Sequence, residues 1–310
     1  MQLTNIRVPG KVMLSGEYAV LYGGSAVLIP VPRFMEISET DSPESDSSSP
    51  VVSEALTLDI PAISSFEHKH GCPHVKVNRN AFYEANTDGR LLKLGLGSSA
   101  AEAVGVIKLR LKRAGFRGPE LINPLMEFAF RAHDKAQGML GSGADVAACA
   151  IGEPIKYSSK FDIKSGAISR TVVGLPIECK YPLNLVWTGV SANTPAMVRQ
   201  FGQWLNLQAD QAKMLLAQLV LSANALADSW FNVPLPQLLI RVDEFSMIMG
   251  ECADQAGIIY RLPIHEKIEK WAIANGGRAK PTGGGGGDMI LLIGELPLNE
   301  LNNLIIPLSV

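Results

Sequence analysis

A glycine-rich turn that runs straight into an apolar helix limits the fold of this chain more than any other feature. Residues 95–101 read Gly-Leu-Gly-Ser-Ser-Ala-Ala, and an apolar stripe at helical spacing follows them. Glycines at such a turn leave space above the backbone, and the N–H groups at the start of a helix attract anions. The segment therefore predicts a phosphate-binding turn that opens a helix over residues 98–114.

The sequence signals both ends of this helix. Ser99 and Glu102 have the spacing of a capping box, in which each side chain bonds the backbone N–H of the other residue. Basic side chains gather just before Gly115, where positive charge suits the helix dipole and glycine favours termination. We therefore expect a capped helix that ends near Gly115.

A dinucleotide-binding turn is the main alternative for the same residues. Gly95, Gly97 and Ala100 match the G-x-G-x-x-A fingerprint, which needs a strong strand before it and an acidic residue about 20 positions later. The residues before Gly95 carry charges, and the nearest suitable acid, Glu120, follows a Gly-Pro pair in an expected loop. We therefore favour a phosphate turn, and the sequence contains no G-x-x-x-x-G-K-[ST] P-loop.

The N-terminal segment predicts a strand that contains one cation. Residues 9–21 read Pro-Gly-Lys-Val-Met-Leu-Ser-Gly-Glu-Tyr-Ala-Val-Leu, with a turn expected at Ser15-Gly16. Lys11 interrupts an otherwise apolar run. A lone lysine of this kind usually extends to solvent from a strand edge. The alternative is a positive charge that points into a cleft.

Five consecutive glycines, 283–287, stand between Thr282 and Asp288. A flexible linker has this composition, but a linker leads to another domain or to a tail. Here the apolar strand expected over 289–293 follows almost at once. We therefore expect a packed glycine loop that approaches another group closely.

The composition excludes several classes of protein. With 310 residues, 47% hydrophobic and 19% charged, the chain is long enough for two lobes that share one cleft. Its net charge of −2 gives no reason to expect a nucleic-acid partner. The four cysteines lack C-x-x-C spacing and are expected to be free thiols in a reducing compartment, the cytoplasm. We see no signal peptide and no apolar run that could span a bilayer, so we expect no membrane partner.

The order of the expected elements indicates an α+β fold, because strands and helices mix without regular βαβ alternation. Helices are expected at 98–114, 119–136, 144–150, 194–205, 208–229, 235–256 and 265–274, and strands within 1–37 and 154–173 and at 75–77, 183–188 and 289–293. The acidic, serine-rich segment 38–53 is expected to be a mobile loop.

The three glycine-containing segments together resemble the GHMP kinases, a family named after galactokinase, homoserine kinase, mevalonate kinase and phosphomevalonate kinase. Residues 9–20 look like the first motif of the family, 95–101 like the second, which is its phosphate-binding loop, and 282–287 like the third. The resemblance implies an α+β, two-lobed GHMP kinase fold. An N-terminal α/β lobe at 1–177 would carry the phosphate-binding loop, and a ferredoxin-like C-terminal lobe would occupy 178–310.

Finer features resemble the branch of the family that phosphorylates phosphomevalonate. Tyr18 stands where mevalonate kinases usually carry His, and His133 where they place a metal-binding Glu. Residues 132–147 and 187–194 also look like that branch. The resemblance implies transfer of the γ-phosphoryl group of ATP to 5-phosphomevalonate, which gives 5-diphosphomevalonate in the mevalonate pathway to isoprenoids. Two alternatives stay open: a mevalonate kinase or other small-alcohol kinase, and a nucleotide-binding protein without catalytic activity.

The resemblance also implies roles for individual residues. Lys11 and Asp145 would be catalytic and would pair with each other, and Ser99 would ligate Mg²⁺. The nucleotide-binding residues would be Gly95, Leu96, Gly97, Ser98, Ser99 and Ala100. The acceptor would contact His133, Gln137, Ser142, Ser191, Thr194, Gly285 and Gly286. The implied cofactors are ATP and Mg²⁺, the implied partner is a small anionic substrate, and the chain could pair into a homodimer.

Two of these residues also have simpler explanations. Asp145 stands just before Val146 and would suit the N-cap of a short helix. His133 would equally fit as a hydrogen-bonded histidine within a helix. The partners of each side chain distinguish between these explanations.

Overall fold

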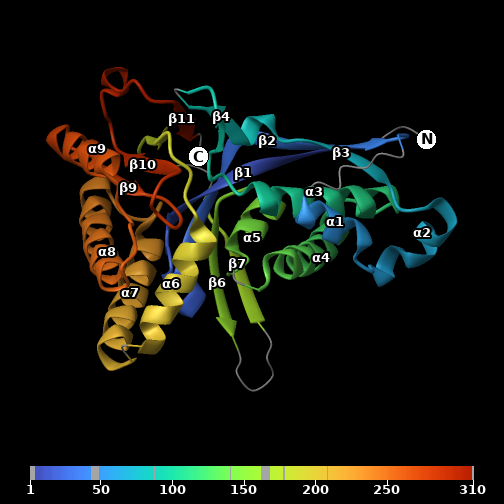
Figure 1. Cartoon of the computed structure of the whole chain (residues 1–310), viewed down its shortest axis with the longest axis horizontal. Helices are drawn as coiled ribbons and strands as arrows, with labels where there is room; N and C mark the ends of the chain where they lie inside the picture. The colour runs from blue at the N-terminus through green and yellow to red at the C-terminus, as the bar shows by residue number, and fades with distance from the viewer. Residues whose placement is uncertain are drawn as a thin grey trace. The chain divides into compact units, whose positions relative to one another are not determined.

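The computed structural model describes residues 4–42, 49–86, 88–139, 141–161, 168–176, 179–207 and 209–308 (Figure 1). The chain forms two compact units that alternate along the sequence. Unit 1 comprises residues 1–11, 30–83 and 96–152, and unit 2 comprises residues 12–29, 84–95 and 153–310. The contiguous lobes expected at 1–177 and 178–310 stay a prediction.

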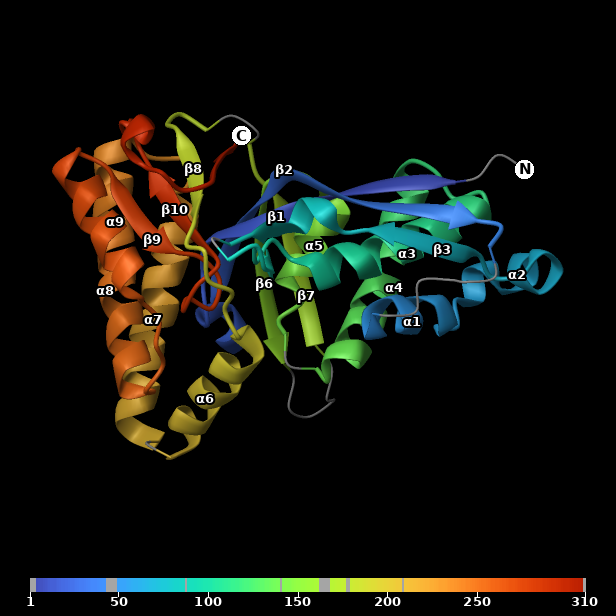
Figure 2. The same cartoon turned by 45° about the horizontal axis from the view of Figure 1, so that its top comes forward.

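Unit 1 combines strands with a group of helices. Its elements are the first part of β1 (Asn5–Ser15), the second part of β2 (Ser25–Thr40), α1 (Pro50–Thr57), α2 (Ser64–His70), β3 (His74–Asn78), α3 (Ser98–Arg113), α4 (Pro119–Gln137) and α5 (Ala144–Ile151). Helix α3 runs along the strands (Figure 2). A β-carbon on Gly105 would lie 2.1 Å from Ile37 and 3.3 Å from Val8, so a residue without a side chain lets the helix approach the sheet closely.

The capping box expected at the start of α3 is wrong. The helix begins at Ser98, its N-cap is Gly97, and no side chain caps it. The carboxylate of Glu102 is buried and bonds Arg79 and Ser49 instead. A buried carboxylate needs charged or polar partners, and this requirement prevails over a local cap.

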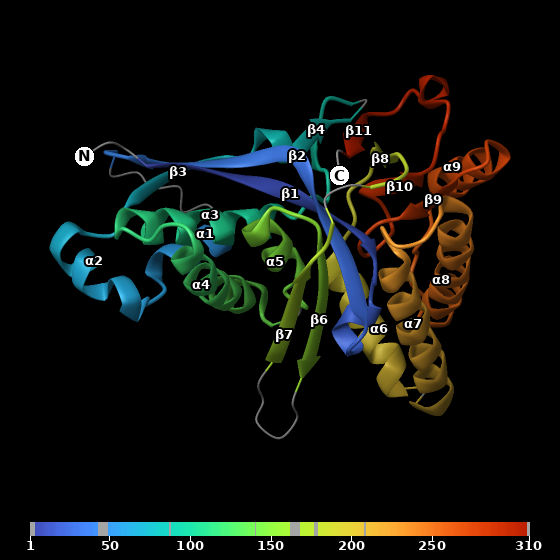
Figure 3. The ribbon, with the colours of Figure 1, turned by 180° about the vertical axis from the view of Figure 1, so that it is seen from behind.

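Unit 2 holds the remaining elements. They are the second part of β1, the first part of β2, most of β4 (Tyr83–Ala85), β5 (Leu91–Lys93), β6 (Ile155–Phe161), β7 (Ile168–Gly174), β8 (Leu183–Trp187), α6 (Thr194–Leu207), α7 (Ala209–Ser229), α8 (Leu235–Gln255), α9 (Pro263–Ala274), β9 (Arg278–Pro281), β10 (Met289–Ile293) and β11 (Ile305–Leu308). Strands β6 and β7 pair side by side as an antiparallel hairpin (Figure 3).

One sheet of unit 2 has the antiparallel order β11-β8-β10-β9. Every residue of the inner strand β10 is buried, which explains why its sequence is apolar throughout. Helix α9 packs against this sheet through Ile268 and Ala272, which join a core with Val186, Ile290 and Leu292. The glycine loop 282–287 connects β9 to β10 and therefore starts and ends on a packed sheet.

A second sheet has the order β1-β2-β6-β7, and β3 pairs with β2. Strand β2 is long enough to serve both units. Its residues 25–28 pair with β6 in unit 2, and its residues 36–40 pair with β3 in unit 1. The boundary between the units therefore falls inside a continuous strand.

The expected α+β class is confirmed at the level of mixed helices and antiparallel sheets. The expected loop 38–53 is wrong at both ends, because residues 38–40 finish β2 and Pro50 begins α1; residues 43–48 lie outside the described residues. All four cysteines are free, as expected. Among the described residues, no helix has the length and hydropathy that a membrane crossing requires.

Candidate active site

An ion pair between the buried Lys11 and the partly exposed Asp145 lies in unit 1. Lys11 belongs to β1 and is only 7% exposed, and its Nζ lies 3.1 Å from Oδ1 of Asp145. The lysine therefore does not extend to solvent from a strand edge. Asp145 is the second residue of α5, whose N-cap is Gly143 without a side-chain bond, so Asp145 is not the N-cap. Its carboxylate is directed at the cation.

The side chain of Lys11 crosses the glycine-rich turn. A β-carbon on Gly97 would lie 2.7 Å from Cε of Lys11, and the backbone N–H of Lys11 donates to the carbonyl of Leu96 at 3.0 Å. Gly97 also has a φ of +78°, which side chains disfavour. The backbone angle therefore favours glycine at position 97, and a side chain there would displace Lys11 from its place over the turn.

The start of α3 presents unpaired donors beside this cation. Ser98, Ser99 and Ala100 form the first turn of the helix, where N–H groups lack acceptors within the helix. Ser98 and Ser99 are half-buried and Ala100 is buried. The helix dipole adds positive potential at the same end. Because Lys11 packs on Gly97 and pairs with Asp145, it links the N-terminal ends of α3 and α5.

His133 joins the site through Ser99. Its Nε2 lies 3.2 Å from Oγ of Ser99, within hydrogen-bonding distance, and the tautomer of the ring decides which atom donates. The histidine is 9% exposed on α4, so it is indeed a hydrogen-bonded helix histidine, but its partner belongs to the turn. Ser142 accepts a hydrogen bond from the N–H of Ala144 at 3.2 Å, at the start of α5. Gln137 is the half-buried last residue of α4.

The other predicted site residues gather around the glycine loop of unit 2. A β-carbon on Gly284 would lie 3.2 Å from the side chain of Thr194. Ser191 donates from Oγ to the carbonyl of Lys93 at 2.9 Å. A β-carbon on Gly95 would lie 2.4 Å from Cγ of Asp288, the residue that ends the loop. Gly95 thus packs against the residue that follows the glycine loop.

The glycine loop is packed, as expected, and the group that it approaches is its own chain. A β-carbon on Gly285 would lie 2.2 Å from the ring of Tyr260, and the N–H of Gly286 donates to the Tyr260 carbonyl at 2.9 Å. A β-carbon on Gly287 would lie 2.7 Å from the carbonyl of Val190. Close backbone packing therefore requires glycine at positions 285, 286 and 287, whereas the space around Gly283 is open and its φ of +63° is what favours glycine there.

The sequence reasoning missed another ion pair, between Glu17 and Lys280, which is buried on both sides. Both side chains are completely buried in unit 2, and Nζ of Lys280 donates to Oε1 of Glu17 and to the carbonyl of Pro281, the latter at 2.8 Å. The available signal was one charge of each sign beside a glycine turn in an apolar segment. Asp288 was also missed: its Oδ1 accepts from the N–H of Ala192 at 3.1 Å.

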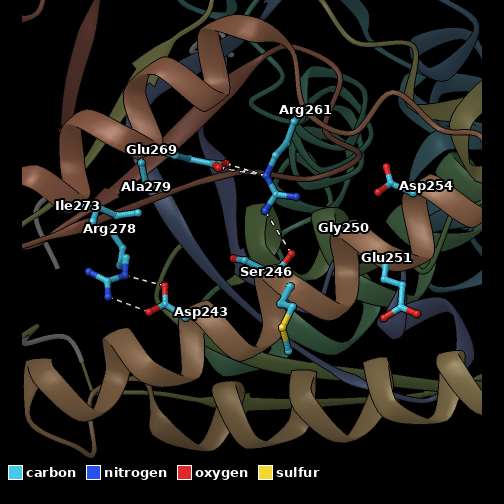
Figure 4. A pocket seen from close by; sticks show the side chains of 11 residues that line it. Asp243, Ser246, Gly250, Glu251, Asp254, Arg261, Glu269, Ile273, Arg278 and Ala279 are labelled. Atoms are coloured by element: carbon cyan, nitrogen blue, oxygen red, sulfur yellow. Dashed lines mark hydrogen bonds and ion pairs between the residues drawn. The ribbon is translucent and has the colours of Figure 1, made fainter.

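A cavity of about 470 Å³ in unit 2 contains none of the predicted site residues (Figure 4). It lies among α8, α9 and β9, where Arg261 pairs with Glu269 and Arg278 pairs with Asp243. Glu251 and Asp254 add two further carboxylates to its wall, so acidic side chains outnumber basic ones. An anionic substrate would be repelled here, and this cavity does not suit the expected chemistry.

Comparison with curated proteins shows similarity to phosphomevalonate kinases. The chain is 26% identical to the phosphomevalonate kinase of a Streptomyces species over an alignment of 343 residues, gaps included. The alignment covers 93% of this chain and 89% of the relative. It is 24% identical to that of Saccharolobus solfataricus over 319 residues, which cover 97% of this chain and 92% of the relative. No known family description matches the chain.

Comparison with solved structures shows similarity of fold. The chain matches a protein of Listeria innocua with a TM-score of 0.80 and 20% identity, covering 99% of both chains. It matches Streptococcus pneumoniae phosphomevalonate kinase in complex with phosphomevalonate and AMPPNP with a TM-score of 0.71 and 19% identity, covering 94% of this chain and 92% of that one. In its motifs and in its fold, this chain is therefore GHMP kinase-like, with phosphomevalonate kinases among its relatives.

Proposed function

We propose that this chain is an ATP-dependent kinase of the mevalonate pathway that transfers the γ-phosphoryl group of ATP to 5-phosphomevalonate. An oxygen of the acceptor phosphate bonds to the γ-phosphorus, the bond from that phosphorus to the β,γ-bridging oxygen breaks, and ADP and 5-diphosphomevalonate leave. The observation that carries the proposal is Lys11, buried beside Asp145 at the N-terminal ends of α3 and α5. The similarity to phosphomevalonate kinases supports the choice of acceptor.

The start of α3 would hold the triphosphate of ATP. Free N–H groups of residues 98–100 point along the helix axis, and the dipole favours negative charge at this end. Lys11 packs on Gly97, so its charge lies beside the same N–H groups. Anionic oxygens would therefore meet backbone donors and a cation together, which is the arrangement that phosphoryl transfer needs.

The residues at this site fit a bound Mg²⁺. Ser99 and Asp145 offer hard oxygen ligands, and the Asp145 side chain is 39% exposed, so it can be reached by a hydrated ion. Mg²⁺ typically takes one or two protein ligands and fills its other positions with phosphate oxygens and water. When bound with ATP, the ion neutralises charge on the phosphate oxygens.

Lys11 and Asp145 would have different roles in phosphoryl transfer. The ammonium group of Lys11 faces developing charge on the transferring phosphoryl group, and Asp145 fixes its position through the 3.1 Å contact. An acceptor that is itself a phosphate monoester is already anionic near neutral pH, because its second pKa is about 6. No strong base is then required, and Asp145 acts by positioning. With an alcohol as acceptor, Asp145 would instead have to orient or accept the hydroxyl proton.

The residues predicted to bind the acceptor fall into two sets. His133, Gln137 and Ser142 belong to unit 1, and His133 and Ser142 already bond atoms of the α3 and α5 starts. Ser191, Thr194, Gly285 and Gly286 belong to unit 2, around the glycine loop. Hydroxyl, imidazole and backbone N–H groups suit an anionic, oxygen-rich substrate.

Finer structural and cellular assignments are also inferred. The antiparallel order β11-β8-β10-β9, with α9 packed on the sheet, supports a ferredoxin-like C-terminal lobe. The four free cysteines support a location in the cytoplasm. A homodimer stays a prediction.

An ADP-release assay with ATP, Mg²⁺ and a panel of acceptors tests the proposed function. We expect turnover with 5-phosphomevalonate, and phosphorus NMR should identify a diphosphate product. Turnover of mevalonate or another alcohol, with none of 5-phosphomevalonate, would instead favour a mevalonate kinase or other small-alcohol kinase. Binding of ATP without turnover of any acceptor would favour a non-catalytic nucleotide-binding protein.

A further inference from the structure

The buried pair of Glu17 and Lys280 needs an explanation beyond stability. Both side chains are completely removed from water. Taking two opposite charges out of water costs more than their attraction commonly returns, and apolar replacements of such pairs are often as stable. A pair of this kind is therefore informative through what it holds in place.

The segment that contains Glu17 contacts the glycine loop and its approach at successive points. Lys280 bonds Glu17 and also donates to the carbonyl of Pro281, the residue before Thr282. Burial raises the pKa of Glu17, while the attraction of Lys280 and the backbone N–H of Gly283 favour its ionised form. Pro281 and Gly283, the residues on either side of Thr282, are thus tied to this ion pair.

Tyr18 supplies the next contact. Its hydroxyl donates to the carbonyl of Gly284 at 2.9 Å, and its ring stacks on Phe201 with centroids 4.6 Å apart. Tyr18 has a φ of +57°, a backbone conformation that costs energy for a residue with a side chain. The turn after Gly16 is therefore held in a strained form that points both Glu17 and Tyr18 at the loop.

The loop depends on such external contacts. Gly283, Gly285 and Gly286 have positive φ values and carry no side chains that could fix the loop by their own packing. Glycine also loses more conformational freedom on folding than any other residue. The position of this segment is consequently set by the groups that contact it. Glu17 and Lys280 contact Gly283 and the preceding Pro281.

We propose that Glu17 and Lys280 are positioning residues that hold the glycine loop 282–287 in the place where it receives the acceptor. This inference rests on the proposed function, in which Gly285 and Gly286 contact the acceptor. Neither charged side chain touches substrate, because both are enclosed. Their effect passes through the backbone at Pro281 and Gly283.

Three variants test this role: Glu17→Gln, Lys280→Met and the double variant Glu17→Gln/Lys280→Met. Each single change leaves the opposite charge buried without a partner. The double change removes both charges and should therefore preserve the fold. We expect each variant, the double one included, to raise the KM for the acceptor by about tenfold or more, because small displacements of substrate-positioning groups have large effects. The KM for ATP should change by less than about twofold.

Lys156→Met is the matched control. Lys156 also forms an ion pair within unit 2, with Asp228, but its side chain is 30% exposed and it belongs to β6, which is not one of the strands that flank the loop. The same substitution there should leave both KM values unchanged. A purely structural role for Glu17 and Lys280 would lower the melting temperature and leave the acceptor KM of the folded enzyme at its wild-type value.

Hydrogen exchange gives a second reading that does not depend on activity. The N–H of Gly286 bonds the Tyr260 carbonyl at 2.9 Å, and the N–H of Asp288 bonds the Val190 carbonyl at 2.7 Å. We expect both amides to exchange at least about tenfold faster in the double variant, with the amides of β10 as the internal reference. A double variant with wild-type exchange and wild-type acceptor KM would overturn the inference. A wild-type protein that turns over no acceptor would refute only the proposed function. The exchange experiment would still decide whether Glu17 and Lys280 hold the loop.

Discussion

The charge of Lys11 provides the sharpest test of the proposed site. Replacing Lys11 by Met keeps an unbranched side chain that can pack over Gly97 and removes only the ammonium group. A fixed charge or donor aimed at the transferring group contributes about 2.7–4 kcal/mol to transition-state stabilisation. At about 1.4 kcal/mol per factor of ten, we expect kcat to fall on the order of 10²- to 10³-fold.

The same substitution should affect binding and stability far less. The N–H groups at the start of α3 remain in place, so the KM for ATP should stay within about threefold of the wild-type value. Asp145 loses its partner, but its side chain is 39% exposed and water can solvate the carboxylate. The free energy of unfolding should therefore fall by less than about 1 kcal/mol.

Steady-state kinetics and urea unfolding on the same preparations measure both effects. Arg7→Met is the control, because Arg7 lies on the same strand, its side chain is 61% exposed, and it pairs with Glu36 at 3.5 Å. Its kcat should stay within about twofold of wild type. A folded Lys11→Met protein with a kcat within about threefold of wild type would refute the assignment of Lys11.

Two further predictions concern the turn and a buried histidine. Gly97→Val should weaken ATP binding at least about tenfold, since its β-carbon would lie 2.7 Å from Cε of Lys11 at a φ of +78°; calorimetry that found wild-type affinity in the folded variant would contradict this. Burial lowers the pKa of His265 from 6.5 to about 4, so between these values the folded state binds fewer protons than the unfolded state. The free energy of unfolding should thus fall by up to about 3 kcal/mol as the pH drops through this window. His265→Asn, which can still accept from the N–H of Leu262, should flatten the fall, and urea unfolding that shows the same slope in both proteins would exclude His265 as its cause.

Much of the candidate site could be predicted because its signals are local. Glycine turns, helix starts and apolar strands each occupy a few consecutive residues, so α3, α5 and the packed loop before β10 were expected near their observed bounds. The pairing of Lys11 with Asp145 came from the family resemblance, since no local pattern connects them.

The errors arose where distant partners decide the structure. Glu102 has the spacing of a capping residue, but Arg79, from another segment, donates a hydrogen bond to its carboxylate. Helix α1 begins at Pro50 directly after a serine-rich, acidic stretch whose composition suggests a loop. Glu17 and Lys280 are 263 positions apart, and each alone looks like an ordinary surface charge.

That separation has a consequence for how the chain is made. Glu17 leaves the ribosome long before its counter-charge, which lies 263 positions later in the chain, is translated. Because unit 2 also joins residues 12–29 to residues 153–310, its interior cannot close vectorially as the polypeptide emerges. A chain that stops before Lys280 leaves Glu17 without its counter-charge. We therefore expect such a truncated chain to be degraded by proteases and not to form a smaller enzyme.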